Sequence, residues 1–238
     1  MIFRILTTRD FLRKQEPDYV PAAGEIDFGH MRRLKPISSD FGFSRGGPID
    51  RYYIEQFLKK NAGDIKGHAL EVKDDSYLNR FGGSQVIKKD ILDIDSGNRL
   101  ATVIADLSQA QNIPDNSYDC IILTQVLQYI YDVRSTIKHL HRILKPGGIL
   151  LLTVPGVSHF VYKVYSNIWC WCFSKYSVHK LLKEAFIENN IKIETYGNVL
   201  VASSFLYGIG ANELKKEEYD YTDPDYQVII AARAVKSA

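Results

Sequence analysis

The chain has 238 residues, of which 45% are hydrophobic and 24% charged, and this balance excludes an intrinsically disordered protein. Its 30 basic and 28 acidic residues leave a formal net charge of +2, so no global positive field indicates nucleic acid as a partner. Three cysteines are too few for a disulfide framework and lack zinc-ligand spacing, and no apolar run could span a bilayer, so we expect a cytoplasmic protein without a metal site or a transmembrane segment.

The first 48 residues contain many prolines and glycines and no long periodic pattern. We therefore predict that residues 1–48 form an N-terminal extension that packs on a main domain of residues 49–238. The main domain opens with a helix over residues 48–61, because Pro48 suits the first turn of a helix and apolar side chains then recur on one face.

From His68 onward, short apolar runs alternate with turn signals and one clear helical pattern. The predicted strands are HALEV (68–72), QVIKKDIL (85–92), ATVIADL (101–107), DCIILTQVL (119–127) and ILLLTVP (149–155). A helix over residues 135–148, ended by Pro-Gly-Gly, precedes the fifth strand. This alternation predicts a parallel sheet with right-handed crossovers.

The last third of the chain departs from simple alternation. We predict a helix over 176–190, a strand over 191–197, a mostly helical stretch over 199–218 and a final strand over 225–235. Because the final strand follows the sixth closely enough to pair with it, we expect it to enter the sheet antiparallel.

Acidic residues follow the first two predicted strands. Glu71 closes the first strand and Asp90 closes the second, about twenty positions further on, where dinucleotide-type folds place an acid for ribose hydroxyls. Ligands of open parallel sheets bind beyond the carboxyl ends of the strands, and an ionised carboxylate there makes strong hydrogen bonds. These two positions are therefore candidates for a cofactor pocket.

The third and fourth strands end in the same way. Asp106 follows the third strand, where its side chain can reach an adenine amino group while the Leu107 N–H meets the ring. Thr124 and Gln125 end the fourth strand at the centre of the sheet, nearest the reacting end of a bound cofactor. One acid at a strand end is commonplace, but three consecutive ones favour a pocket.

Residues 68–155 resemble a class I S-adenosylmethionine-dependent methyltransferase of the type 11 group. The run IPDNSYDCIIL resembles that group's P-D-N-S-F-D-x-V passage, and LKPGGILLLTVP resembles its turn into the fifth strand. FGFSRGGPIDRYYIEQFL, DDSYLNRFGG and YTDPDYQVIIAARAV resemble a narrower bacterial subfamily whose members often accompany glycosyltransferases or surface-polysaccharide genes. The likeness covers residues 32–236.

The resemblance implies a Rossmann-like three-layer α/β sandwich, with a mostly parallel seven-stranded sheet and an antiparallel last strand. It also implies S-adenosylmethionine as cofactor and methyl transfer to an oxygen or nitrogen of a small or glycan-like acceptor, in surface-polysaccharide biosynthesis with associated glycosyltransferases. The predicted cofactor-binding residues are Glu71, Lys73, Asp90, Asp106, Leu107, Thr124 and Gln125.

No catalytic residue is assigned, because the sulfonium is already activated and positioning supplies much of the catalysis. Tyr129, Asp132 and His159 are candidate bases, although structural roles explain each of them better.

The first loop departs from the family pattern at Lys73. The family usually has E-x-G there, whereas this chain has Glu71-Val72-Lys73. Glycine permits close approach of the backbone and a positive φ. A lysine would crowd the cofactor or pair with its carboxylate, and its charge would repel a sulfonium. An inactive methyltransferase-like binding or scaffold domain is therefore the alternative; a nucleotide-dependent oxidoreductase is disfavoured because no G-x-G-x-x-G follows the first strand.

Two further features have both a functional and a structural explanation. Asp50 and Arg51, in a passage whose Arg45 and glycines could fold over the cofactor, are also explained by helix capping and ion pairing. An aromatic run after the fifth strand suits an acceptor-facing lid or a hydrophobic core; it comprises Tyr162, Tyr165, Trp169, Trp171 and Phe173.

Overall fold

The computed structural model describes residues 19–161, 164 and 167–237. Contacts divide the chain into two compact units, Met1–Lys35 and Pro36–Ala238. The described part of the first unit contains one 3-10 turn, Gly29–Met31. The second unit contains every strand of the sheet. The boundary after residue 48 that the sequence suggests stays a prediction.

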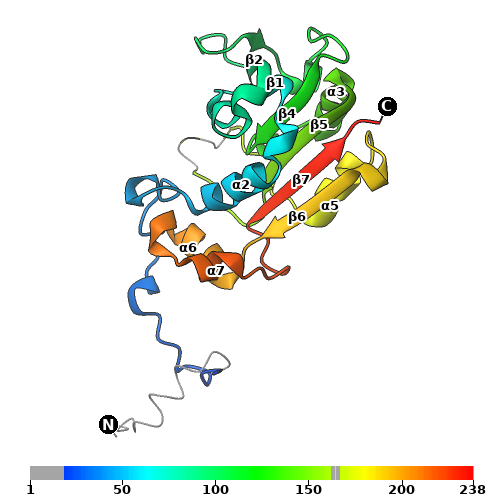
Figure 1. Ribbon diagram of the computed structural model, residues 1–238. Coiled ribbons are helices and arrows are strands. Elements are labelled where there is room, and N and C mark those ends of the chain that lie inside the picture. Colours follow the sequence, from blue (N-terminus) through cyan, green and yellow to red (C-terminus); the bar gives the residue numbers. More distant parts are fainter. Residues whose placement is uncertain (1–18, 162–163, 165–166, 238) are drawn as a thin grey trace, which may run out of the picture. The chain divides into compact units, whose positions relative to one another are not determined.

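A seven-stranded sheet is the centre of the second unit (Figure 1). The strands are β1 (Gly67–Val72), β2 (Val86–Asp93), β3 (Val103–Ile104), β4 (Tyr118–Thr124), β5 (Leu144–Pro155), β6 (Ile191–Tyr196) and β7 (Ile229–Val235). Their order is β3-β2-β1-β4-β5-β7-β6, and only β7 runs antiparallel to its neighbours. The predicted mostly parallel α/β sheet with an antiparallel last strand is confirmed.

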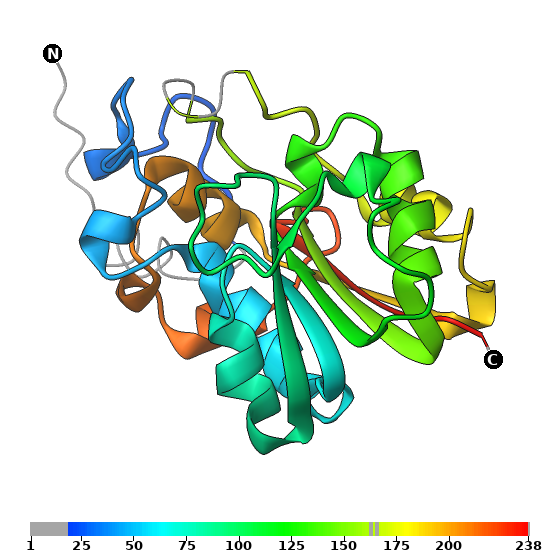
Figure 2. The same cartoon turned by 90° about the horizontal axis from the view of Figure 1, so that it is seen from above.

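Helices cover both faces of the sheet, as Figures 1 and 2 show. They are α2 (Ile49–Lys60), α3 (Val133–Ile143), α5 (Lys175–Leu182), α6 (Val199–Tyr207) and α7 (Lys216–Asp220). Side chains alternate along β4, so that Ile121 and Leu123 pack with α3 and α5 while Cys120 and Ile122 pack with α2. Both faces of the central strands are buried, which explains their nearly continuous apolar sequence.

Polar side chains mark where several helices begin. Asp132 caps α3 by accepting from the N–H of Ser135, and Asn198 caps α6 by accepting from the N–H of Val201. α6 ends at Gly208, whose φ of 69° suits a residue without a Cβ. These local signals agree with the burial pattern, so the helices begin and end where the core requires them.

Several predicted elements differ in length from the structure, two helices and the third strand among them. The helix predicted over 135–148 ends at Ile143, because Leu144 and Lys145 precede Pro146 and adopt strand conformation instead. The helix predicted over 176–190 ends at Leu182, and the third strand is only two residues long. The interior of each element was nevertheless identified.

The acid that closes β2 was predicted wrongly. We expected Asp90 to close this strand, but Ile91 and Leu92 continue the pairing with Glu71 and Val72 of β1. The strand ends at Asp93, and the turn residues that stop it lie beyond that position. The carboxyl end of β2 therefore presents a different acid from the one we selected.

A glycine-containing seam joins the segment before α2 to the segment after α6. Built onto Gly208 or Gly210, a Cβ would lie 2.0 or 1.9 Å from the backbone oxygen of Ser38 or Arg45. Arg45 also forms a two-point ion pair with Glu213, with Nε–Oε1 and Nη2–Oε2 distances of 2.7 and 2.5 Å. The start of α2 is thus held by a part of the chain far away in sequence.

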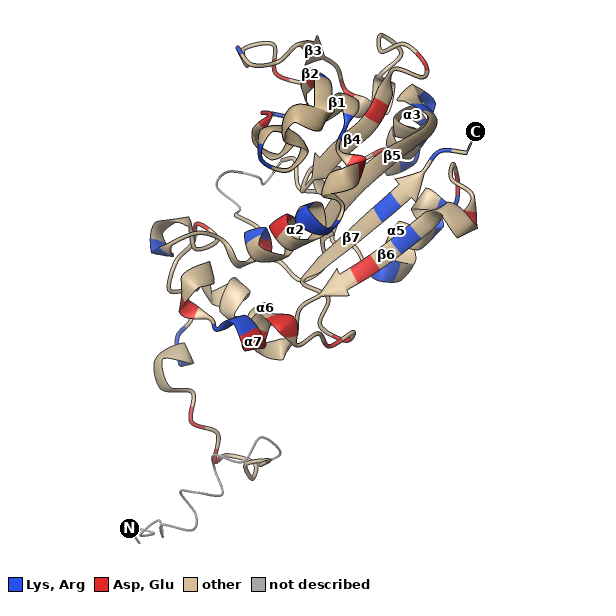
Figure 3. Cartoon of the chain, in the orientation of Figure 1, with Lys and Arg blue, Asp and Glu red and all other residues tan. Residues whose placement is uncertain are grey.

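Basic and acidic residues are interspersed over the elements (Figure 3). On β6, for example, Lys192 and Glu194 point to the same face, and Glu194 pairs with Lys60 of α2 at 2.7 Å. None of the described helices is long and apolar enough to cross a membrane.

Candidate functional site

A cavity of about 990 Å³ lies at the carboxyl ends of β1, β2 and β4, and α2 and the segment around Trp169 contribute to its walls. Six of the seven residues predicted to bind the cofactor line it: Glu71, Lys73, Asp106, Leu107, Thr124 and Gln125. The seventh, Asp90, does not. The volume is that of a ligand site, and its position is where open parallel sheets bind ligands.

Glu71 organises the loop that follows β1. Its side chain is 3% exposed, and its two oxygens accept from the backbone N–H groups of Tyr77 and Leu78 at 3.2 and 2.8 Å. Burial raises the pKa of this carboxyl to about 7, although the two hydrogen bonds oppose the shift. Glu71 thus holds the shape of the loop from a nearly water-free position.

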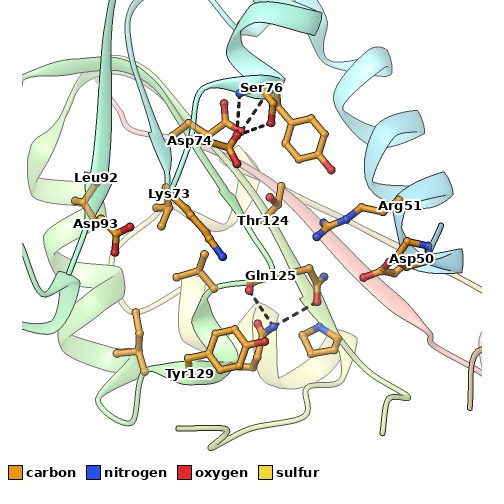
Figure 4. Close-up of a pocket in the computed structure, with 18 of the residues that line it drawn as sticks. Asp50, Arg51, Lys73, Asp74, Ser76, Leu92, Asp93, Thr124, Gln125 and Tyr129 are labelled. Atoms are coloured by element: carbon orange, nitrogen blue, oxygen red, sulfur yellow. Dashed lines mark hydrogen bonds between the residues drawn. The ribbon is translucent and has the colours of Figure 1, made fainter. Parts of the chain in front are cut away.

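Lys73 adopts a positive-φ backbone conformation that glycine adopts without strain. Its φ is 80°, its N–H donates to Leu92 O at 2.8 Å, and its carbonyl accepts from Asn98 at 2.8 Å. Figure 4 shows its side chain extending into the cavity. The loop therefore keeps its glycine-like path, while a cationic side chain occupies space that glycine would leave open.

Most non-glycine residues with a positive φ in the described chain line this cavity. The described chain has four non-glycine residues at positive φ, namely Phe41, Lys73, Asn116 and Gln125, and all except Asn116 line the cavity. Each such conformation costs about 1–3 kcal/mol and persists only where surrounding contacts enforce it. Backbone strain of this kind clusters at binding sites, which strengthens the functional assignment of the cavity.

Asp93 takes the position at the end of β2 that we assigned to Asp90. It lines the cavity, and its carboxylate accepts from the N–H of Asp95 and from Asn98 at 3.0 and 2.7 Å. Burial alone would raise its pKa, but these bonds and the charge of Lys73 hold the pKa below its usual value. Asp93 is therefore ionised and aimed at the site.

The carboxylate of Asp90, by contrast, is hydrogen-bonded to side chains of the sheet and its connecting loop. Its carboxylate contacts His68 Nε2 at 2.7 Å, Thr102 Oγ1 at 2.8 Å and the hydroxyl of Tyr118 at 3.3 Å. These partners account for both oxygens. The turn residues Asp95-Ser96-Gly97 are the sequence signal that would have placed the end of the strand at Asp93, which lines the cavity.

The ends of β3 and β4 complete the sheet side of the cavity. Asp106 accepts from both the N–H and the hydroxyl of Ser108 at 2.8 Å, which fixes its orientation, and Leu107 is 3% exposed. Thr124 is the last residue of β4, and Gln125 follows at a φ of 54°. The predicted residues at these two ends therefore converge on one space.

The cavity lining is acidic although the whole chain is slightly basic. Seven acids line it, Asp50, Glu55, Glu71, Asp74, Asp93, Asp95 and Asp106, against three bases, Arg51, Lys73 and Arg80. Such a surface attracts cations and repels phosphate groups. This distribution suits a sulfonium cofactor and disfavours a dinucleotide.

Two of these lining residues come from the first turn of α2. Backbone N–H groups of the first turn donate to the Asp50 carboxyl group, but its Oδ1 is buried without a hydrogen-bond partner among the described residues. Burial raises the pKa of Asp50, against the opposing charge of Arg51. The Arg51 guanidinium is hydrogen-bonded to the Tyr77 hydroxyl. Hydrogen bonds at the helix start therefore leave the Oδ1 atom of Asp50 without a partner in the described part of the chain.

An aromatic and apolar wall closes another side. It comprises Phe41, Tyr129, Ile168, Trp169 and Phe205. Within it, Gln128 is 1% exposed; its Nε2 donates to Gln125 O at 3.0 Å, and its buried Oε1 has no partner in the described chain. A bound molecule that donates a hydrogen bond would satisfy this oxygen.

The three candidate bases differ in their positions. Tyr129 lines the cavity. Asp132 is the cap of α3 and does not line it. His159 packs against Phe41 in a tilted arrangement, with ring centroids 4.3 Å apart, and burial lowers the pKa of its imidazole. Only Tyr129 therefore meets the cavity directly.

The predicted aromatic lid is divided between different roles. Trp169 lines the cavity, whereas Trp171 and Phe173 do not. Tyr162 and Tyr165 lie outside the described residues. Among the described residues, no group of three histidines, cysteines or acids could hold a metal ion.

Comparisons with known proteins agree with this geometry. Residues 61–191, more than half of the chain, match a family model described as a methyltransferase domain. The chain is 35% identical over 88 residues to ubiquinone/menaquinone biosynthesis C-methyltransferase UbiE of Hahella chejuensis. That match covers 34% of each protein, so the chain spans about a third of the length of this curated relative.

Solved structures show the same fold. A SAM-dependent methyltransferase from Archaeoglobus fulgidus superposes with a TM-score of 0.53 at 13% identity, covering 78% of this chain and 94% of that one. A Haemonchus contortus phosphoethanolamine N-methyltransferase 2 in complex with S-adenosyl-L-methionine gives 0.55 at 18% identity, covering 83% and 54%. The chain belongs to the methyltransferase domain family, and its fold is that of solved S-adenosylmethionine-dependent methyltransferases, as predicted.

Proposed function

We propose that the protein transfers a methyl group from S-adenosylmethionine to an oxygen or nitrogen of a small or glycan-like acceptor. The observation that carries this proposal is the acidic cavity at the ends of β1, β2 and β4, with Asp93 ionised at its edge. The acidic lining complements a sulfonium cation, and the buried acceptors Asp50 Oδ1 and Gln128 Oε1 are left for ligand donors.

Each strand end binds a different part of the cofactor. Asp93 accepts hydrogen bonds from the ribose hydroxyls, in place of Asp90. Asp106 and the backbone of Leu107 meet the adenine, as their place after β3 suggests. Lys73 and Gln125 border the methionine part, near the reacting centre. When bound, S-adenosylmethionine supplies a methyl group already activated on a sulfonium, so the protein chiefly has to position the acceptor and exclude water.

The aromatic wall forms the acceptor side. Gln128 Oε1 orients an acceptor that carries an N–H or O–H group, and the rings of Tyr129 and Trp169 exclude water and pack against a sugar or flat ring. Tyr129 is the candidate base for a hydroxyl acceptor, since it alone of the three candidates lines the cavity, and its phenolate form would take the proton. A carbon acceptor is the second candidate, because the curated relative is a C-methyltransferase.

The proposed role in surface-polysaccharide biosynthesis beside glycosyltransferases rests on the sequence alone. The proposed cytoplasmic location does so as well.

The rival hypothesis is an inactive binding or scaffold domain disabled by Lys73. Two observations favour the active enzyme. The backbone at Lys73 keeps the positive φ that the family's glycine provides, and the lysine charge is opposed by ionised Asp93. The loop is therefore preformed for a cofactor despite the substitution.

Calorimetric titration with S-adenosylmethionine and S-adenosylhomocysteine tests the cofactor assignment, and mass spectrometry of protein purified without dialysis tests for a retained acceptor. We expect both cofactor forms to bind, and S-adenosylhomocysteine to accumulate when acceptor mixtures are added. Absence of binding at millimolar ligand would overturn the enzyme proposal. Binding without turnover on oxygen, nitrogen or carbon acceptors would favour the scaffold.

A further inference from the structure

The strongest feature that the strand-end assignments leave unused is the pair of opposite charges at the start of α2. Asp50 and Arg51 are adjacent in sequence, lie in the first turn of a twelve-residue helix and both line the cavity. In Figure 4 they lie on one side of the cavity and Asp93 on the other, with Lys73, Thr124 and Gln125 between them. The pair therefore faces the cavity from the end opposite the proposed ribose site.

One oxygen of the Asp50 carboxylate lacks a hydrogen-bond donor among the described residues. Its Oδ1 is buried and accepts no hydrogen bond in the described chain. A buried carboxylate oxygen without a donor carries an unfavourable desolvation cost, which a bound cation with N–H groups would remove. An ammonium group has both properties.

Arg51 offers the complementary chemistry. One of its interactions is the hydrogen bond with the Tyr77 hydroxyl, and it also feels the charge of Asp50. A guanidinium has five N–H donors in a planar fork that matches a carboxylate. A carboxylate acceptor and a guanidinium donor on one wall suit a ligand that carries an ammonium and a carboxylate on the same carbon, which is the α-amino-acid group.

We infer that Asp50 and Arg51 bind the amino-acid end of S-adenosylmethionine, with Asp50 Oδ1 accepting from the α-ammonium and Arg51 donating to the α-carboxylate. This inference rests on the proposed function. The Arg45–Glu213 ion pair and the glycine seam hold the segment before α2, so the pair is positioned before the cofactor arrives. The start of α2 thus binds the methionine end of the cofactor, beside the loop after β1 in which lysine replaces glycine.

The test compares two ligands that differ at this end. S-adenosylhomocysteine carries the amino-acid group, whereas 5′-methylthioadenosine has the same nucleoside and thioether without it. We expect Asp50→Asn and Arg51→Gln each to weaken S-adenosylhomocysteine binding about tenfold or more, as expected for a lost charged hydrogen bond. Binding of 5′-methylthioadenosine should stay within about twofold of wild type, because neither residue faces the part that remains.

Arg134→Gln is the matched control. Arg134 does not line the cavity, and its side chain is 72% exposed and pairs with Glu184 at 3.2 Å, so we expect unchanged affinity for both ligands. Melting temperatures of the free variants verify folding, and Asp50→Asn should melt no lower than wild type because it removes a buried charge whose Oδ1 has no hydrogen-bond partner in the described chain.

Each outcome separates the pair from the cofactor site as a whole. Wild-type affinity for S-adenosylhomocysteine in both variants, or equal losses for the two ligands, would overturn the inference while leaving the proposed function intact. Failure of the wild-type protein to bind either ligand would overturn the proposed function and the inference together.

Discussion

The two ends of the cavity are built differently. At the proposed adenosine end, acids that follow consecutive strands are held by local turn hydrogen bonds, as Asp93 is by Asp95 and Asn98 and Asp106 is by Ser108. At the proposed methionine end, a lysine at positive φ meets a helix whose start is held by a distant segment. The first end follows from the general geometry of parallel sheets, whereas the second depends on contacts particular to this chain.

The pH dependence of stability at the methionine end is the largest effect we expect. Glu71 has a pKa of about 7 in the folded protein and about 4.3 when unfolded, so it stabilises the fold fully below about pH 4, and this contribution is lost as the pH rises through 7. Relative to Glu71→Gln, the wild-type free energy of unfolding should therefore fall by about 3 kcal/mol between pH 4 and 8.

Urea denaturation of both proteins across this range measures the difference. Comparing the two removes the titration of the histidines, which the proteins share. Parallel curves at a constant offset would mean that Glu71 is ionised throughout and that its burial does not govern the loop after β1.

At the adenosine end, we expect Asp93 and Asp90 to behave differently. Asp93→Ala should weaken S-adenosylhomocysteine binding by about 1.5–3 kcal/mol, roughly tenfold to hundredfold, through loss of charged hydrogen bonds. Asp90→Ala should lower the melting temperature, because His68 and Thr102 lose their partner, with affinity nearly unchanged. Calorimetry and thermal melts on the two variants check this. The reverse pattern would restore the ribose role to Asp90.

The conformation of Lys73 makes a further prediction about stability. Lys73→Gly should raise the free energy of unfolding by about 1 kcal/mol, because glycine adopts a φ of 80° without strain while its greater freedom when unfolded offsets part of the gain. Chemical denaturation measures this value. Asn116→Gly, at a positive φ of 54° outside the cavity, is the matched control and should show a gain of similar sign. A loss in the Lys73 variant alone would mean that the lysine side chain makes stabilising contacts.

The charge of Lys73 should have the smallest effect, and it discriminates between the two cofactor forms. Lys73→Met keeps the side-chain length and removes the charge, so affinity for cationic S-adenosylmethionine should rise about fivefold relative to that for S-adenosylhomocysteine. Calorimetry with both ligands gives the ratio. A fall in affinity for both would show that Lys73 pairs with the cofactor carboxylate, so that the methionine end depends on the lysine.

The sheet could be predicted from sequence because its central strands are continuous apolar runs with clear turn signals between them. β2 was harder. Ile87 is 88% exposed, and Lys88 and Lys89 follow it, so its first half shows no buried pattern from which the strand end could be counted. Asp90 was chosen because it lies about twenty positions after Glu71, although the pairing of β2 with β1 extends to Leu92.

The methionine end was less accessible to sequence reasoning. Lys73 was identified as an anomaly, but nothing local to the sequence indicates that its φ is positive. Asp50 and Arg51 read equally well as helix residues until the fold brings the start of α2 to the ends of β1 and β4. Gln128 lacked any signal, because a buried glutamine with an unsatisfied oxygen is recognised only in three dimensions.

The close backbone approach at Gly208 and Gly210 has a consequence for how this protein can diverge. A side chain at either glycine would displace the segment that precedes α2, although neither glycine lines the cavity. Substitutions there should accordingly be tolerated only together with changes near residues 38–46. Among natural relatives, these two short stretches are expected to covary as one inherited unit, separate from the strand-end acids.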